Sequence, residues 1–263
     1  MAEAVDPPFD RPDAGFNDLS GWSWIGCYGG YYLQADLLSE FEHGFFTRQW
    51  QGRDPDVLAA YVSAGVSVHR PQQVHSATVL PASKACGEPW PKADGLVSDA
   101  GGQSLWVCGA DCTPVLIADR GSGRVAACHA GWRGVAGRIL AVALEQLLDA
   151  GSRRQDLLIA LGPAIAGPHY QVDQPVVEAI ARSLGEGKEA ALQEHGVMEP
   201  EADGHHWRLD IRAAARLQLQ QLGISDGQIS SCPLCTWRET QLFHSWRRDQ
   251  RKAVQWSGIV SQG

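Results

Sequence analysis

Three short segments of the sequence each place a metal-ligating side chain at the end of an expected strand. They carry His75, Cys112 and His129. Two imidazoles and one thiolate suit zinc, and three protein ligands leave the fourth position of a tetrahedral ion open for water or substrate. Their separation in the sequence matches no compact zinc-finger spacing. The residue types therefore indicate an open, catalytic zinc site, while the spacing alone does not establish it.

The segment after His129 has the composition of an anion-binding turn. Gly131 and Gly134 bracket Trp132 and Arg133 between an expected strand and an expected helix. Backbone N–H groups, the helix dipole and a guanidinium would converge on one anion there. An ordinary tight turn has the same composition, and the segment is neither of the common glycine-rich phosphate motifs. Phosphate binding by this turn is thus a hypothesis.

Two further motifs have a structural reading beside the functional one. Cys232 and Cys235 form a Cys-x-x-Cys pair, but a zinc ribbon needs a second such pair, so we expect buried thiols. Arg247 and Arg248 follow an aromatic stretch. They would form a purine-stacking or anion-binding wall, or else a structural cation–π contact.

The elements that must position these residues mix strands and helices without strict alternation. Helical periodicity with capping signals predicts helices over 54–65, 135–150, 173–185 and 210–223. Apolar and β-branched runs predict strands over 74–80, 104–110, 114–118, 124–128, 157–161 and 228–231. This order favours mixed sheets covered by helices.

Composition limits the class of protein. The 263 residues carry a formal net charge of −8, which argues against a nucleic-acid binder. With 44% hydrophobic residues the chain can bury a large core, and we expect one domain over 1–263 with a flexible N-terminal segment over 1–20. No secretion signal or membrane-length apolar run is found, and the seven cysteines are odd in number, so we expect a cytoplasmic protein. Nothing in the sequence indicates its oligomeric state.

Taken together, five motifs occur in the order seen in one family. They are Gln73-Val74-His75, Ala93-Asp94-Gly95-Leu96-Val97, Ala110-Asp111-Cys112-Thr113-Pro114-Val115-Leu116, His129-Ala130-Gly131-Trp132-Arg133-Gly134, and Gly162-Pro163-Ala164-Ile165 through Tyr170-Gln171-Val172. From about His43 onward the chain resembles the YfiH/laccase-domain family, whose members are called multicopper polyphenol oxidases, purine nucleoside phosphorylases or peptidoglycan-editing factors. The resemblance implies an α+β, four-layer α/β/β/α fold with mixed β-sheets.

The resemblance also implies a zinc site of His75, Cys112 and His129, with purine nucleosides and inorganic phosphate as substrates. The implied reactions are phosphorolysis of adenosine, inosine, guanosine or methylthioadenosine, and deamination of adenosine at C6 by a metal-activated water. Asp111 and Asp94 are candidates for proton transfer or for support of the ligands. Candidates for binding the phosphate are the basic residues Arg48, Arg133, Arg247 and Arg248.

The chain departs from the family pattern in its substrate loops. Thr47-Arg48 is followed by Gln49-Trp50-Gln51 in place of glycines. The usual Ser-Tyr-Arg-Arg is Ser245-Trp246-Arg247-Arg248, and Lys252-Ala253-Val254 stands where Thr-Gly-Arg is familiar. These changes leave the metal motifs intact.

Three other readings remain open. Cys112 with His129 as its base would make a cysteine amidohydrolase, which suits peptidoglycan editing. The site could also be non-catalytic, as a structural zinc or a small-molecule sensor. A structural zinc would need a fourth ligand such as Cys128, but adjacent strand residues point to opposite faces. A multicopper oxidase needs about a dozen ligands, mostly His, and the chain has nine His in all, so zinc is favoured over copper.

Overall fold

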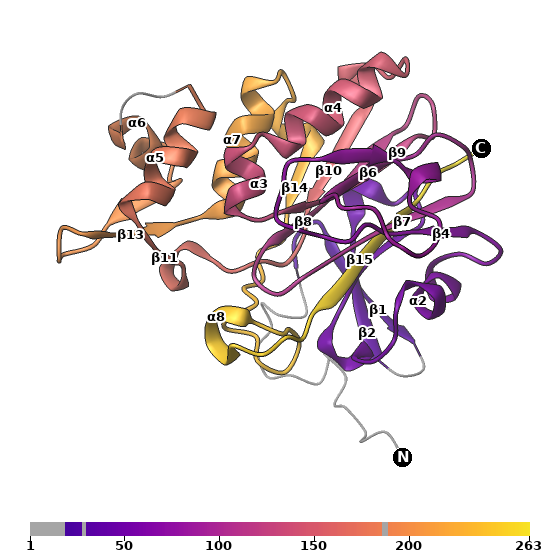
Figure 1. Ribbon diagram of the computed structural model, residues 1–263, viewed down its shortest axis with the longest axis horizontal. Coiled ribbons are helices and arrows are strands. Elements are labelled where there is room, and N and C mark those ends of the chain that lie inside the picture. The colour runs from indigo at the N-terminus through magenta and orange to yellow at the C-terminus, as the bar shows by residue number, and fades with distance from the viewer. Residues whose placement is uncertain (1–18, 28–29, 186–188) are drawn as a thin grey trace.

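Two six-stranded sheets lie at the centre of the computed structural model, which describes residues 19–27, 30–185 and 189–263 (Figure 1). The first sheet has the order β1 (Trp22–Cys27), β2 (Gly30–Ala35), β3 (His43–Phe46), β15 (Gln255–Val260), β7 (Gln103–Gly109) and β4 (Ser67–His69). The second has the order β14 (Ile229–Ser231), β10 (Leu157–Leu161), β8 (Thr113–Asp119), β9 (Val125–Ala130), β6 (Gly95–Val97) and β5 (Val79–Pro81). A small third sheet has the order β11 (Gln171–Asp173), β13 (His206–Leu209) and β12 (Met198–Pro200).

Both large sheets are mixed. In the first, β4 runs parallel to β7 while the other neighbours are antiparallel. In the second, β14 is parallel to β10 and β5 is parallel to β6. The third sheet is antiparallel. The mixed sheets expected from the order of elements are therefore confirmed.

Helices cover the outer faces of the two sheets (Figure 1). On the second sheet lie α3 (Trp132–Ala136), α4 (Ile139–Asp149) and α7 (Ile211–Gln221), and beside the third sheet lie α5 (Gln174–Ser183) and α6 (Glu189–Glu194). On the first sheet lies α2 (Pro55–Val62), and the short α8 (Trp246–Asp249) precedes β15. In the described part of the chain, none of the helices combines the length and apolar character that crossing a bilayer requires.

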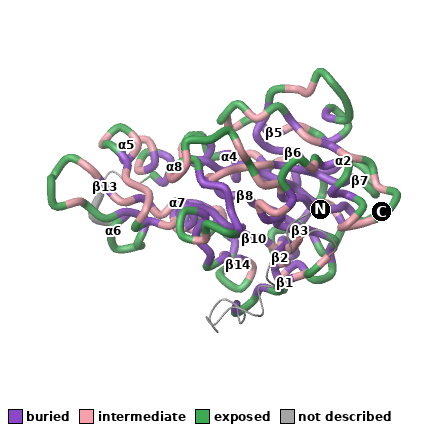
Figure 2. The backbone as a smooth tube through the Cα atoms, turned by 90° about the horizontal axis from the view of Figure 1, so that it is seen from below, coloured by how far each residue is buried: buried purple, intermediate pink, exposed green. Residues whose placement is uncertain are grey.

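Three buried clusters show the order of the layers, and the strands that carry them are the most buried part of the backbone trace (Figure 2). Leu105 and Leu116 belong to the cluster between the two sheets. Ile117 and Leu140 belong to the cluster between the second sheet and its helices, and Leu58 to the cluster under α2. The order is helix, sheet, sheet, helix, as the family resemblance implied.

The four expected helices are present, but one is interrupted. The segment expected as a single helix over 135–150 is divided into α3 and α4, because Arg138 adopts a left-handed conformation with φ of 61°. Residues 1–18, which hold most of the expected flexible N-terminal segment, lie outside the described residues.

The expected strand over 74–80 is wrong except at its end, where β5 begins at Val79. The preceding residues form a loop whose backbone N–H groups donate to a carboxylate instead of to a neighbouring strand. The donors are Val74, His75 and Ser76, and the acceptor is Asp94. A side chain distant in sequence thus replaces the strand partner that the apolar pattern implied.

Candidate metal centre

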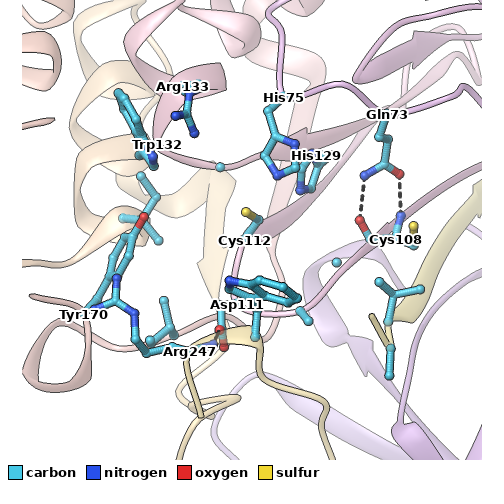
Figure 3. Close-up of a pocket in the computed structure, with 18 of the residues that line it drawn as sticks. Gln73, His75, Cys108, Asp111, Cys112, His129, Trp132, Arg133, Tyr170 and Arg247 are labelled. Carbon is cyan, nitrogen blue, oxygen red and sulfur yellow. Dashed lines mark hydrogen bonds between the residues drawn. The ribbon is translucent and has the colours of Figure 1, made fainter. Parts of the chain in front are cut away.

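The fold brings His75, Cys112 and His129 together. Their ligand atoms all lie within 4.8 Å of one another (Figure 3). His75 lies in the loop before β5, Cys112 in the crossing from β7 of the first sheet to β8 of the second, and His129 in β9. Two imidazoles and a thiolate at this separation fit a zinc ion with an open fourth position.

Asp94 holds the loop that carries His75. Its carboxylate is fully buried and accepts hydrogen bonds from the backbone N–H groups of Val74 (3.2 Å), His75 (2.9 Å) and Ser76 (2.6 Å). The hydroxyl of Ser76 donates to it as well, at 2.8 Å. His75 has a φ of 60°, which is unfavourable for a residue with a Cβ. The buried carboxylate offsets that cost and fixes the imidazole at the cluster.

The same carboxylate orients His129. Nδ1 of His129 lies 3.0 Å from Oδ1 of Asp94, and the backbone N–H of His129 donates to the Asp94 carbonyl at 2.7 Å. Because an ionised carboxylate only accepts, Nδ1 carries the proton and Nε2 is left for the sulfur or an ion. This arrangement is the carboxylate support that metal-binding histidines commonly have.

The electrostatics of the cluster favour the thiolate that a metal requires. Burial opposes ionisation of Cys112, but the His129 charge and hydrogen bonds from His129 and His75 outweigh it and lower its pKa to about 6. Burial likewise opposes protonation of His129, yet Cys112 and Asp94 raise its pKa to about 9. Burial would raise the pKa of Asp94, but bonds from His129 and Ser76 lower it to about 2. The site is therefore preset as an ion pair with an anionic sulfur.

Cys128 is not a fourth ligand. It is fully buried in the cluster between the second sheet and its helices, and burial, with the Asp94 charge, raises its pKa to about 12. The expectation that it points away from its neighbour His129 is thus confirmed. Cys232 and Cys235 are also buried and unpaired, as expected.

The turn between β9 and α3 lets the chain pass close to the sulfur. A Cβ on Gly131 would lie 2.7 Å from Sγ of Cys112, so only glycine fits there without displacing it. The helix that follows has only five residues, which weakens the expected contribution of a helix dipole. Arg133 nonetheless lines the cavity beside the cluster. Its guanidinium lies 4.3 Å from the centre of the Trp132 ring.

The cluster lines a cavity of about 580 Å³. This volume suits a small-molecule site. Apart from the cluster, its charged and aromatic lining consists of Arg133, Arg247, Arg251, Trp132, Tyr170, Trp246 and Asp111. Figure 3 shows Trp132, Arg133 and Tyr170 on one side of the cavity and the His–Cys–His cluster on the other.

Two of the four arginines expected at the phosphate reach this cavity. Arg133 and Arg247 line it, whereas Arg48 and Arg248 are not among the described residues that do. Arg48 donates to the Thr240 carbonyl at 2.6 Å. Arg248 donates to three main-chain carbonyls, those of Thr236, Trp237 and Phe243. Both guanidinium groups are therefore bound to the backbone of residues 236–243.

Asp111 lines the cavity but is engaged elsewhere. It has a φ of 88°, and its carboxylate accepts from the Thr236 hydroxyl and from the backbone N–H of Arg247, each at 2.7 Å. One oxygen therefore docks the start of α8, which carries Arg247, and the other holds the loop that contains Thr236. This commitment weakens the expectation that Asp111 transfers protons.

Sequence reasoning missed several lining residues. Arg251 lies in the loop after α8, where the family pattern lapses, so no motif marked it. Tyr170 belongs to a motif, but nothing in the sequence shows which way its ring points. Gln73 also belongs to one, and its amide exchanges two hydrogen bonds with the backbone of Cys108, at 2.7 and 2.8 Å. A side chain that replaces a strand partner in this way has no sequence signature.

Comparison with known proteins shows which family the chain is similar to. The family described as multi-copper polyphenol oxidoreductase laccase matches residues 55–261. A Synechocystis relative named purine nucleoside phosphorylase slr1573 is 41% identical over 256 residues, which cover 91% of this chain and 97% of the relative. The Shigella flexneri protein named purine nucleoside phosphorylase YfiH is 34% identical over 181 residues, 68% of each chain.

Solved structures agree with the sequence matches. YlmD from Geobacillus stearothermophilus superposes with a TM-score of 0.78 at 25% identity, covering 91% of this chain and 99% of that one. A Bacillus licheniformis hypothetical protein YfiH gives a TM-score of 0.76 at 28% identity, covering 88% and 96%. Proteins similar to the chain thus include YfiH and YlmD, which share its fold. Because the family match spans most of its length and a relative is 41% identical, the chain belongs to the multi-copper polyphenol oxidoreductase laccase family.

Proposed function

We propose that the chain is a zinc-dependent purine nucleoside phosphorylase that accepts adenosine, inosine, guanosine and methylthioadenosine and also deaminates adenosine. The observation that carries the proposal is one cavity in which the His–Cys–His cluster, three arginines and three large aromatic rings meet. The names of the Synechocystis and Shigella relatives support phosphorolysis.

His75, Cys112 and His129 would hold the zinc ion. A bound zinc supplies Lewis acidity, which makes a nucleophile of water at neutral pH, as deamination at C6 requires. The chain's own part is to keep the sulfur anionic, through His129 and His75, and to keep Nδ1 of His129 protonated, through Asp94.

Arginines and aromatic rings divide the recognition of the two substrates. Arg133 and Arg251 would bind the phosphate beside the ribose C1′, where positive charge develops as the glycosidic bond breaks. The rings of Trp132 and Trp246 offer faces on which a purine stacks. Arg247 would position Tyr170, since its guanidinium lies 5.1 Å from that ring and donates to the Gln171 carbonyl.

Product analysis and metal content test this function. Zinc-loaded protein incubated with adenosine and phosphate should form ribose 1-phosphate, adenine, inosine and hypoxanthine. Zinc per chain should fall in H75A and C112A. Absence of all four products would reject the activity, and unchanged zinc content in both variants would reject the metal assignment.

A cysteine amidohydrolase is the second candidate, because Cys112, His129 and Asp94 form the hydrogen-bonded series of a nucleophile, a base and an orienting carboxylate. Against it, His75 provides a second imidazole to the same sulfur, which a triad does not need. A thiol alkylator should abolish hydrolysis of a peptidoglycan amide by metal-free protein if this candidate is right. A chelator should abolish the nucleoside reactions if it is wrong.

Zinc is proposed in preference to the copper of the family description. In the described residues, groups of three potential ligands occur at His75, Cys112 and His129 and at the partly exposed Glu201, Asp203 and His206. A multicopper centre requires about a dozen ligands, mostly imidazoles.

A further inference from the structure

We propose that Tyr170 is a catalytic residue of phosphorolysis: its hydroxyl donates a hydrogen bond to the purine and stabilises the negative charge that the base acquires as the glycosidic bond breaks. This inference rests on the proposed phosphorylase function and assigns a residue to the leaving-group side of the reaction.

The ring of Tyr170 is fixed from several directions. Its backbone N–H donates to the Gly167 carbonyl and its own carbonyl accepts from Leu209, both at 3.0 Å. The ring packs against the core between the second sheet and its helices, and the Arg247 guanidinium lies 5.1 Å from its centre. Arg247 is itself held by Asp111 and by the Gln171 carbonyl. The side chain therefore reaches the cavity in one defined position (Figure 3).

The hydroxyl of this fixed ring has no hydrogen-bond partner in the ranges that the structure describes. Tyr170 is half-buried, so this hydroxyl is open to the cavity rather than enclosed in the core. The buried Tyr32, on the far side of the first sheet, instead has a partner within the protein and donates to the Tyr61 carbonyl at 3.4 Å. Because Tyr170 lines the cavity, the partner it lacks within the protein can be supplied by a ligand.

Two other polar groups of the lining are already engaged within the protein. The Gln73 amide is bound to the backbone of Cys108, and the Asp111 carboxylate accepts from Thr236 and Arg247. The lining arginines suit the phosphate, whose charge they match. Burial, with the nearby Cys112 charge, raises the pKa of Tyr170, so the hydroxyl stays protonated at neutral pH. A neutral donor is what the purine needs.

The step balances without a further reactant. A phosphate oxygen forms a bond to C1′ of the ribose, the bond from C1′ to N9 breaks, and its electron pair goes to the purine. Charge spreads over the ring nitrogens, and the Tyr170 O–H donates to one of them without giving up its proton. The base takes the proton it needs from solvent on release.

The test compares two leaving groups in zinc-loaded Y170F. With inosine and saturating phosphate, kcat should fall about 10²- to 10³-fold, the usual loss for one donor to a developing charge. With 7-methylinosine, whose base leaves as a neutral molecule, kcat should change little. The matched control is Y61F, because Tyr61 is also partly buried but lies on α2 and is not among the described cavity residues.

Three results would overturn the assignment. Equal loss on both nucleosides indicates a structural role for the hydroxyl, and an unchanged inosine rate indicates no role. A raised KM for phosphate with unchanged kcat indicates anion binding. If the wild-type protein phosphorolyses neither nucleoside, the proposed function itself fails, which the wild-type arm shows independently of the variant.

Discussion

Asp94 supports two of the three proposed zinc ligands, through the backbone of the His75 loop and through Nδ1 of His129. In D94N the amide can no longer accept all of these bonds, so we expect zinc affinity to fall about 10- to 100-fold. Competition for zinc between the protein and a chromophoric chelator measures this affinity.

The control is D99N. Asp99 likewise accepts hydrogen bonds from Ser83 and Gln103, and none of the described cavity residues is among its partners. Equal zinc affinity in D94N and wild type would show that the ligands hold their positions without the carboxylate.

At the residue scale, the sequence predicted a cluster of His75, Cys112 and His129, and the structure brings their ligand atoms together. Metal chemistry restricted the residue types, and the family motifs selected these three. Basic residues carry no such restriction: Arg48 and Arg248 have the right charge, but their guanidinium groups bind main-chain carbonyls. Which arginine reaches a cavity depends on loop conformation.

Among the elements, the junction between β9 and α3 sets the position of the sulfur. In G131A the new Cβ would lie 2.7 Å from Sγ of Cys112 and displace it, although the φ of −75° suits alanine. We expect zinc affinity to fall at least about tenfold. G227A, where a Cβ meets nothing within 4 Å, is the control. Retained zinc affinity in G131A would mean that the turn can shift freely.

The docking of α8 makes a separate prediction. D111N removes an acceptor from the Arg247 backbone, a charge-assisted bond worth about 1.5–3 kcal/mol. If Asp111 only positions α8 and the Arg251 loop after it, the KM for phosphate should rise about tenfold or more, and the kcat of phosphorolysis should fall as Arg247 loses its hold on Tyr170. Steady-state kinetics with varied phosphate measure this. A fall in the kcat of adenosine deamination at unchanged KM would instead restore Asp111 as a proton carrier, because that reaction uses neither phosphate nor a departing purine.

Local signals predicted the longer helices and most of the second sheet, because capping residues and apolar runs act over short distances, but the short α6 and α8 were not predicted. The first sheet was largely missed: of its strands only β7 was predicted. Its middle strand, β15, pairs with β3 about 200 residues earlier, through Ser257 and Phe45. No local pattern encodes such a pairing, nor the left-handed Arg138 that divides α3 from α4.

For the whole molecule, buried neutral histidines predict a loss of stability in acid. Nε2 of His43 accepts from the Ala35 N–H at 2.9 Å, so Nδ1 donates to the Phe41 carbonyl and no further proton fits. Burial lowers the pKa of His43, and this effect outweighs the Phe41 carbonyl and Asp36, which raise it. Burial also lowers the pKa of His69. The unfolded chain thus binds more protons below pH about 6.5, and stability falls as pH falls.

Urea unfolding with a chelator present, at pH 7.5, 6.5 and 5.5, measures this without competition from metal. Each buried histidine contributes a slope of at most about 1.4 kcal/mol per pH unit. H43Q should be less stable at pH 7.5 but lose stability less steeply. Parallel pH profiles for H43Q and wild type would contradict the assignment.

The expected single domain over 1–263 stays a prediction.

The central position of β15 has a consequence for biosynthesis. Ribosomes make the chain from its N-terminus, yet β3 and β7 are joined through a strand made after all the other described strands. Until that strand emerges, both neighbours present unsatisfied edges, which are prone to pair with other chains. The first sheet can therefore be completed only after β15 has been synthesised, and until then the risk of aggregation is greatest at these two edges.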